Sequence, residues 1–359
     1  MKVIFPHFQL WRHGIMVQAV DTRFFGAFWA MQAHAGALDM AVMKPDVSYF
    51  SATPLVLASR ASTLAMAQAE LVRVALAPVE SRIEPFTTKG DRILDRPLVE
   101  VGGKGVFIKE LERSLIDRQC DAAVHSMKDM ESDFADGTMI GAVLPREDCR
   151  DALVGKYADL DALPDGAIVG TSSVRRRALL LHYRPDLRIT LLRGNINSRI
   201  AKLQKGDYDA IILAVAGLKR LNLTIEYTPL DEKIMPTAAA QGALAVQLCD
   251  PALADDETVA RQQAVLDVIS ALACDNSTIE VTAERAMLAY LDGSCHTPIA
   301  ASTRFIDDKT LSLDGMVLSR DGTAAFRRTM TGSKDDAEAL GIAVGAALLD
   351  DAGWRGFLA

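Results

Sequence analysis

The densest group of chemically competent side chains in the sequence is a set of arginines between residues 171 and 199. Arg175 and Arg176 follow small polar residues between an expected strand and an expected helix, where backbone N–H groups and the helix dipole attract anions. Guanidinium forks bind carboxylates or phosphates through paired hydrogen bonds. In a chain of formal net charge −8, this density indicates a site for an organic anion. The seven residues are Arg175, Arg176, Arg177, Arg184, Arg188, Arg193 and Arg199.

Further arginines occupy similar positions at the ends of other expected strands. Arg193-Gly194-Asn195 follows the next strand, Arg199 lies on the helix that this turn opens, and Arg60 ends the first strand of the chain. Side chains at the carboxyl ends of parallel strands face a common crevice. The alternative is a solvated helix face, and it is the favoured interpretation for three arginines away from strand ends: Arg177, Arg184 and Arg188.

Asp129 is the acidic residue best placed for chemistry. It closes the run His125-Ser126-Met127-Lys128-Asp129 at the end of an expected strand. Cationic neighbours favour its ionised form, so it is a candidate acid–base or charge-stabilising group. A structural ion pair explains the same pattern equally well. His125 is expected to pack as a strand residue.

Cys295 stands apart from the other cysteines because it lies in a turn of small residues, Gly293–Pro298. All five cysteines are widely spaced and form no CxxC pair, which argues against a disulfide framework or a structural zinc site and favours a reducing cytosol. An exposed Cys295 could serve as an attachment point or nucleophile, but from these residues alone an inert thiol is the favoured interpretation. Cys295 and His296 lack a third nearby metal ligand.

Gly102-Gly103-Lys104-Gly105 resembles a phosphate loop only superficially. A P-loop requires a glycine five residues before the lysine and Ser or Thr after it, and these positions hold Val99 and Gly105. The segment is better interpreted as a glycine loop that carries one cation, Lys104, toward a cleft.

Alternating strands and helices predict two successive α/β units with a cleft between them. The first unit has expected strands at 55–58, 81–87 and 121–126 and helices from Ser62 to Pro78 and around 107–115. The second has strands at 167–170, 188–192 and 209–215 and helices at 173–183 and 196–205. A smaller α+β segment follows, with helices at 282–291 and 335–349 and strands at 311–317 and 324–329.

Composition excludes several classes of protein. With 359 residues, 50% hydrophobic and 24% charged, the chain is long enough for two or three folded domains, at roughly 100–200 residues each. The negative charge argues against a general nucleic-acid binder, and no apolar run is long enough to span a membrane, so a soluble globular protein is expected. Residues 1–50, rich in Phe and Trp, are interpreted as an accessory extension, with a secretory signal or transit peptide as weaker alternatives.

From about Leu55 to the C-terminus the chain resembles the hydroxymethylbilane synthase (porphobilinogen deaminase) family. Seven motifs in order carry this resemblance: Ala58–Ala65, Val101–Phe107, Ala123–Asp129, Gly170–Arg176, Leu192–Asn195, Asp209–Leu221 and Gly293–Ala300. The sequence departs from the family pattern at Lys89, at Gln247 and at Ala240, where a glycine would permit an unusual backbone angle.

The resemblance implies an α/β fold: two periplasmic-binding-protein-like (type II) α/β domains with a central cleft and a smaller C-terminal α+β domain. The implied boundaries are 1–53 for the extension, 54–147 with 242–263 for domain 1, 148–241 for domain 2 and 264–359 for the C-terminal domain. It also implies a dipyrromethane cofactor held by a thioether to Cys295, with Asp129 as the catalytic carboxylate. The further binding residues that match are Arg60, Ser62, Lys104, Lys128, Ser173, Arg175, Arg176, Arg193, Gly194 and Arg199.

The implied activity is that of a transferase of porphyrin and heme biosynthesis. Four porphobilinogen molecules condense with loss of ammonia into linear hydroxymethylbilane, with neither a metal nor a nucleic-acid or membrane partner, in a cytoplasmic monomer. An Arg-lined cleft suits the carboxylates of the growing chain, and a carboxylate suits the transient cation. Two alternatives remain at this stage, a non-catalytic periplasmic-type anion-binding protein and an inactive paralogue.

Overall fold

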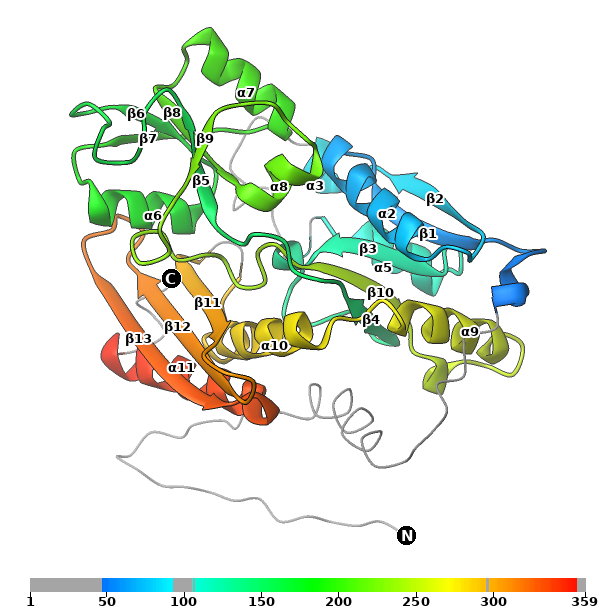
Figure 1. Cartoon of the computed structure of the whole chain (residues 1–359). Helices are drawn as coiled ribbons and strands as arrows, with labels where there is room; N and C mark the ends of the chain where they lie inside the picture. Colours follow the sequence, from blue (N-terminus) through cyan, green and yellow to red (C-terminus); the bar gives the residue numbers. More distant parts are fainter. Residues whose placement is uncertain (1–46, 93–104, 106, 295–296, 354–359) are drawn as a thin grey trace. The chain divides into compact units, whose positions relative to one another are not determined.

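The computed structural model describes residues 47–92, 105, 107–294 and 297–353 (Figure 1). Within these residues the strands form two five-stranded sheets and one three-stranded antiparallel sheet. None of the described helices combines the length and the apolar character needed to cross a membrane. The alternation expected from the sequence is therefore realised as two α/β units followed by a smaller α+β unit.

The first sheet has the strand order β2-β1-β3-β10-β4. Strand β1 pairs in parallel with β2 and with the central strand β3, and β10 runs antiparallel to both β3 and β4. Leu55, Leu57 and Ala58 are fully buried, which explains the continuous apolar run of a strand covered on both faces. The strands are β1 (Leu55–Arg60), β2 (Ser81–Phe86), β3 (Ala122–Ser126), β4 (Thr138–Val143) and β10 (Leu244–Cys249).

Helices cover this first sheet and define its core. Ser62 caps α2 as the sequence predicts, because its side chain accepts a hydrogen bond from the Ala65 N–H. Ile108, Leu111 and Leu115 are buried as expected, although α5 begins only at Lys109. The helices are α2 (Thr63–Ala75), α3 (Lys89–Arg92), α5 (Lys109–Ile116) and α9 (Val259–Ser270), with short 3-10 turns η2 (Val47–Phe50), η3 (Met127–Asp129) and η4 (Pro251–Leu253).

The second sheet repeats the arrangement of the first. Its order is β7-β6-β8-β5-β9, with β6 parallel to β7 and β8, and β5 antiparallel to β8 and β9. Gly206 ends α7 in the left-handed conformation, as its position after the helical pattern predicts. The elements are β5 (Asp151–Gly155), β6 (Ile168–Gly170), α6 (Val174–Tyr183), β7 (Arg188–Thr190), α7 (Ile196–Lys205), β8 (Ala210–Ala214), α8 (Val215–Arg220) and β9 (Tyr227–Pro229).

The chain crosses between the two sheets twice. The first crossing runs from β4 through residues 144–150 into β5, and the second runs from β9 through residues 230–243 into β10. The fourth strand of the first sheet, β10, directly follows the second crossing, and the fourth strand of the second sheet, β5, directly follows the first. Both crossings consequently lie beside the residues that follow the central strands, where a ligand site is expected.

The C-terminal unit is a three-stranded antiparallel sheet packed against two helices (Figure 1). α10 and α11 pack closely because α11 carries Gly341, where an added Cβ would collide with the carbonyl oxygen of Ala283. α10 starts at Asp275, earlier than the expected 282. The elements are α10 (Asp275–Tyr290), β11 (Ile299–Phe305), β12 (Thr310–Leu318), β13 (Ala325–Ser333), η5 (Lys334–Asp336) and α11 (Ala337–Asp351).

Two features of the packing differ from the expected boundaries. Phe50, inside the expected extension 1–53, is fully buried in the core of the first sheet. Val265, Val268 and Ile269 of α9 pack in that same core, so the expected boundary between 263 and 264 falls within a helix of the first unit.

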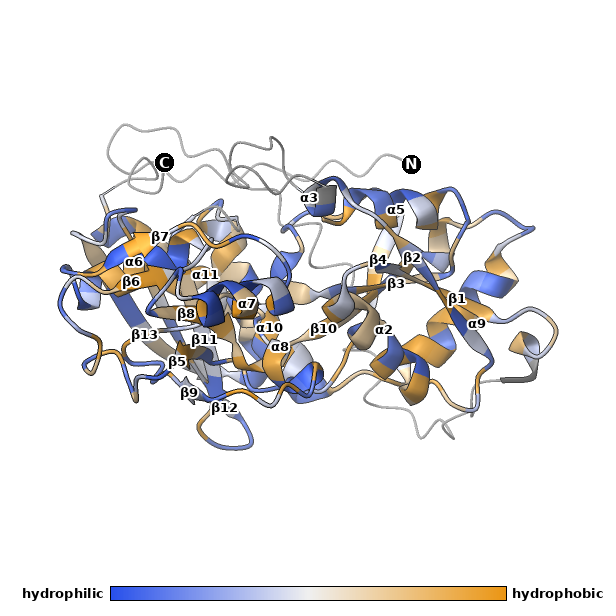
Figure 2. Cartoon of the chain, turned by 90° about the horizontal axis from the view of Figure 1, so that it is seen from above, coloured by the Kyte–Doolittle hydropathy of each residue, from blue (hydrophilic) through white to orange (hydrophobic). Residues whose placement is uncertain are grey.

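Figure 2 shows hydrophobic residues concentrated in strands such as β1 and β6, whereas α7, which buries only Ile200, is largely hydrophilic.

Candidate active site

One cavity of about 550 Å³ lies among the residues that follow the central strands of both sheets. The described residues that the sequence predicts for a site all line this cavity: Arg60, Ser62, Lys128, Asp129, Ser173, Arg175, Arg176, Arg193, Gly194 and Arg199. Lys104 and Cys295 lie outside the described residues, as does His296. Gly293, Ser294 and Thr297, on either side of Cys295 in the chain, also line the cavity.

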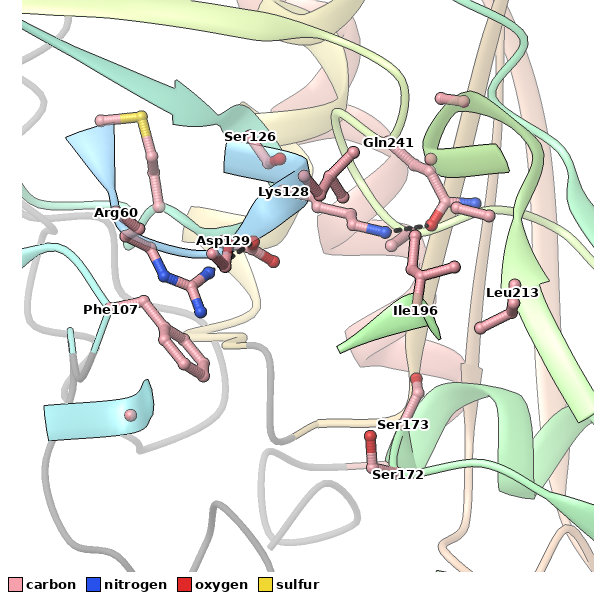
Figure 3. Close-up of a pocket in the computed structure, with 18 of the residues that line it drawn as sticks. Arg60, Phe107, Ser126, Lys128, Asp129, Ser172, Ser173, Ile196, Leu213 and Gln241 are labelled. Atoms are coloured by element: carbon pink, nitrogen blue, oxygen red, sulfur yellow. Dashed lines mark hydrogen bonds and ion pairs between the residues drawn. The ribbon is translucent and has the colours of Figure 1, made fainter. Parts of the chain in front are cut away.

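Arg60 leaves β1 at the edge of the cavity and contacts three different groups (Figure 3). Its guanidinium forms two hydrogen bonds with the carboxylate of Asp91. It also stacks over the ring of Phe107, 4.1 Å from the centroid, and lies 4.0 Å from a carboxylate oxygen of Asp129. These contacts fix the cation next to Asp129.

Asp91 is a site residue that sequence reasoning missed. Thr88 donates to it through its hydroxyl at 2.7 Å, and Arg60 pairs with it from the other side. Although partial burial acts to raise it, these hydrogen bonds and the Arg60 charge hold the pKa of Asp91 below its ordinary value. The sequence signal that could have indicated Asp91 is its place directly after Lys89-Gly90, in a segment that the family pattern covers.

Lys128 and Asp129 lie on the short turn η3 that follows β3. The turn is held in position because Met127 donates its N–H to the carbonyl oxygen of Ala243 at 3.1 Å. The side chain of Asp129 is 37% exposed, which leaves it accessible from the cavity. Lys128 donates to Gln241 at 2.9 Å, an interaction marked in Figure 3.

Arg175 and Arg176 are buried, although the sequence indicates that they bind a ligand directly. Both are buried at the start of α6 and share the fully buried carboxylate of Asp151, with one 2.7 Å hydrogen bond to each of its oxygens. Burial would raise the pKa of Asp151, but the two guanidinium charges hold it far below its ordinary value. Asp151 and Gln241, which also donates to it at 2.7 Å, were both missed from the sequence.

This buried cluster keeps an excess of positive charge beside the cavity, because two guanidiniums share one carboxylate. The remaining terminal nitrogens donate to backbone oxygens, those of Pro236 and Ile212. The Nε atoms of Arg175 and Arg176 are buried, and no group in the described part of the chain accepts a hydrogen bond from them. Both donors are enclosed in the protein interior, so Arg175 and Arg176 influence the cavity through their positive charge.

Arg193, Gly194 and Arg199 form a further cationic part of the cavity wall, near the start of α7. Asn195 caps this helix by accepting from the Ser198 N–H at 2.9 Å, and Arg199 donates to the carbonyl oxygen of Gly194 at 2.7 Å. Gly194 has φ +116°, and a Cβ there would overlap the Ser198 hydroxyl. Burial, followed by the charges of Arg176 and Arg193, lowers the pKa of Arg199 to about 10.

Cations outnumber acids around the cavity within the described ranges. Arg220, a further cation that sequence reasoning did not select, donates to the carbonyl oxygen of Gly242 at 2.7 Å. The seven cationic residues are Arg60, Lys128, Arg175, Arg176, Arg193, Arg199 and Arg220, against the three acids Asp91, Asp129 and Glu131. The cavity wall is thus suited to an anion that carries several negative charges, and the accessible carboxylate of Asp129 lies among the cations.

Other sequence expectations have clear structural outcomes. Arg177 and Arg188 are exposed, whereas Arg184 pairs with Asp186 at 2.7 Å. His125 is buried in the sheet, as predicted. Ala240 adopts φ +58°, the left-handed angle that a glycine would adopt without strain. The buried amide of Gln247 donates to Glu112 and Thr138, which gives this family departure a structural role.

The fold and the cavity together define an α/β protein with a cationic cavity between its two five-stranded sheets. Two family models match the chain, described as "Porphobilinogen deaminase, dipyromethane cofactor binding domain" over residues 55–260 and "Porphobilinogen deaminase, C-terminal domain" over residues 278–350. The chain belongs to the porphobilinogen deaminase family. Family membership confirms the resemblance seen in the sequence.

A curated relative supports the same assignment. The porphobilinogen deaminase of Brevibacillus brevis is 46% identical over 297 residues, which cover 81% of this chain and 92% of the relative. Among solved structures, the VFT2 domain of Bordetella pertussis BvgS has 13% identity and a TM-score of 0.34, with 60% of this chain and 85% of that chain covered. The amino acid ABC transporter substrate-binding protein AbpA of Streptococcus pneumoniae has 15% identity and a TM-score of 0.30, with 62% of this chain and 90% of that chain covered.

Membership of this family makes the chain a transferase of porphyrin biosynthesis with a domain that binds the dipyrromethane cofactor. The reaction of the family is the stepwise deaminative condensation of four porphobilinogen molecules into hydroxymethylbilane. A purely non-catalytic anion-binding protein is not favoured by these matches.

Proposed function

We propose that the cavity described above is the site of this condensation, with Asp129 as the catalytic carboxylate. The observation that carries the proposal is the arrangement of cations around the accessible carboxylate of Asp129. Arg60 lies 4.0 Å from Asp129, and further parts of the wall are lined by the buried Arg175 and Arg176 of α6 and by Arg193 and Arg199 near the start of α7. Such a wall stabilises a polyanion, while the carboxylate stabilises a cation that forms within it.

The arginines would bind the acetate and propionate groups of substrate and product. Each hydrogen bond between a guanidinium and a carboxylate contributes about 1.5–3 kcal/mol, so several of them hold a chain of rings firmly. Arg60, Arg193 and Arg199 line the cavity, and the buried Arg175 and Arg176 add positive charge to its wall. Ser62 and Ser173 begin α2 and α6, whose N-terminal ends also attract anions.

Asp129 would act on the substrate at the step in which ammonia leaves. Loss of the amine leaves a cationic methylene group on the pyrrole, and a carboxylate about 4 Å away stabilises it by about 4 kcal/mol at an effective dielectric of 20. The same oxygen pair can accept the proton that the ring α-carbon loses after coupling. Arg60 limits the mobility of this carboxylate without neutralising it, because Asp91 already pairs with Arg60.

The residues present fit the dipyrromethane cofactor. The cavity holds about 550 Å³, its wall is cationic, and the residues flanking Cys295 line it, so a thioether at Cys295 would place an acidic two-ring group among the arginines. Lys104 would add a further cation. When bound, the cofactor supplies the ring carbon to which the first substrate is joined. The chain's own residues bind its carboxylates and exclude competing orientations.

We also propose the three-domain division expected from the sequence, adjusted so that α9 belongs to domain 1. The core that contains Phe50, Val265 and Ile269 supports this adjustment. A cytoplasmic monomer is proposed as the working state, which agrees with the family's biosynthetic role and with a thiol that must stay reduced before it is modified.

Intact-protein mass spectrometry tests the proposal directly. The purified protein should show an added mass of two pyrrole units, and Cys295→Ser should abolish it, while Cys120→Ser, at a buried cysteine of the first domain, should retain it. Porphobilinogen consumption should accompany the modified mass. An unmodified parent protein would contradict the proposed site, and a modified protein without turnover would indicate an inactive paralogue.

A further inference from the structure

Gln241 lies on the second crossing between the sheets and is almost completely buried, with 1% of its surface exposed. Its side-chain oxygen accepts from the Lys128 ammonium at 2.9 Å. Its side-chain nitrogen donates to Asp151 and to the carbonyl oxygen of Cys149, each at 2.7 Å. Every hydrogen-bonding group of the amide is therefore engaged.

These bonds connect groups that belong to different parts of the fold. Lys128 follows β3 of the first sheet, whereas Asp151 begins β5 of the second sheet and holds Arg175 and Arg176 of α6. Gln241 is the one described side chain that hydrogen-bonds both Lys128 and Asp151. Figure 3 shows Lys128 and Gln241 reaching toward each other across the cavity from opposite sides.

We propose that Gln241 is a positioning residue whose amide holds the Lys128 ammonium beside Asp129 and the Asp151 carboxylate between the two arginines as one hydrogen-bonded unit. This inference rests on the proposed function, because it concerns residues assigned to that site. Gln241 itself acts through these neighbours.

An amide is the side chain that these neighbours require. The amide nitrogen must face Asp151 and a carbonyl oxygen, so the amide oxygen must face Lys128. A flipped amide would place its N–H donors against the Lys128 ammonium and its oxygen against the acceptors. A carboxylate at this position would repel Asp151, and an apolar side chain of similar length would leave Lys128 and Asp151 short of a partner in a buried setting.

Lys128 provides a reporter for this unit. The charged groups that face it are Asp129 on its own turn, Asp151 on β5, and Arg175 and Arg176 on α6. Burial, followed by the charge of Arg176, lowers the pKa of Lys128 to about 8, against the opposing effect of the two carboxylates. A hydrogen bond accepted by Gln241 favours the charged form, so its removal should lower this pKa further.

The test measures the ionisation of Lys128 in the cofactor-loaded protein by competitive labelling with trace acetic anhydride, read by peptide mass spectrometry. Gln241→Met should move the Lys128 midpoint down by about one pH unit, the size expected for one hydrogen bond to a charged group. Gln241→Glu should move it up, since a negative charge is added. The alkaline limb of the kcat profile should follow in the same directions.

Gln247→Met is the matched control, because it removes a buried amide that bonds Glu112 and Thr138 and does not contact Lys128. It should lower thermal stability without moving the Lys128 midpoint, and exposed Lys205 serves as the internal reference in every sample. An unchanged Lys128 midpoint in folded Gln241→Met protein would overturn the proposal. Labelling needs no turnover, so failure of the proposed function would appear separately, in the intact mass and in substrate consumption.

Discussion

The guanidinium of Arg60 lies 4.0 Å from a carboxylate oxygen of Asp129 and is held there by its pairing with Asp91. Because Arg60 already donates two hydrogen bonds to Asp91, Asp129 keeps its negative charge available to the cavity. Removing Asp91 would let Arg60 pair fully with Asp129 and would weaken the stabilisation of a cationic substrate.

We therefore expect Asp91→Asn to lower kcat by about tenfold, which corresponds to about 1.4 kcal/mol in the barrier. Steady-state rates measured on the cofactor-loaded variant check this expectation. Asp117→Asn, which removes an exposed partner of Arg113, should leave the rate within the error of the parent. Equal rates for Asp91→Asn and the parent protein would mean that this pairing has no part in catalysis.

Asp129→Ala should keep the fold and lose turnover by about a thousandfold, because about 4 kcal/mol of cation stabilisation disappears. Circular dichroism and thermal unfolding report the fold, and single-turnover consumption of porphobilinogen reports the chemistry. A variant with near-normal rates would refute the role assigned to Asp129.

Asp151→Asn should destabilise the protein by about 3–5 kcal/mol, since it leaves two buried guanidiniums without their shared counter-charge. Urea unfolding followed by fluorescence measures the loss. The comparison is Asp186→Asn, which removes a partner of Arg184 that is far more exposed than Asp151 and should lower the stability much less. Similar losses in both variants would contradict the importance of the buried cluster.

Phe50→Ala should lower the free energy of unfolding by about 3–5 kcal/mol, the usual cost of truncating a fully buried phenylalanine. The neighbouring Tyr49 is 42% exposed, so Tyr49→Ala should cost far less. Thermal and urea unfolding of the two variants measure the difference. If the two losses were alike, Phe50 would not belong to the core of the first domain.

His125 should make stability depend on pH in the acid range. Burial lowers the pKa of His125 from 6.5 to about 4, so the unfolded chain binds a proton below about pH 6.5 that the folded protein does not bind until about pH 4. Stability is therefore complete above pH 6.5 and falls as the pH drops toward 4, by at most about 3 kcal/mol from this group.

Urea unfolding of His125→Gln across this pH range should show a flatter profile than that of the parent. A His125→Gln profile as steep as the parent's would assign the acid sensitivity to other groups.

Local patterns in the sequence were sufficient for the elements that carry the site. Ser62 before an apolar helical repeat, Gly206 after one, and the buried run from Asp209 to Val215 each define an element within one or two residues of its observed bounds. The clustering of Arg60 with Arg193 followed from their positions at strand ends.

Longer-range partners could not be predicted in the same way. β5 and β10 are antiparallel strands inserted into otherwise parallel sheets, and their pairing depends on where the chain crosses over. Asp151 and Gln241 have no local pattern that marks them, because their roles arise from burial next to Arg175, Arg176 and Lys128. Phe50 likewise precedes the family motifs and enters the core only through tertiary packing.

The strand order has a consequence for biosynthesis of the chain. All strands of the second sheet come from one continuous stretch, Asp151 to Pro229, whereas the first sheet needs β10, translated more than a hundred residues after β3. During synthesis the second sheet can therefore complete its folding before the first. The edges of β3 and β4 stay unpaired until β10, which lies between them, is available. Chains truncated after residue 243 and released from the ribosome should thus be protected from proteolysis in the second sheet and cleaved readily in the first.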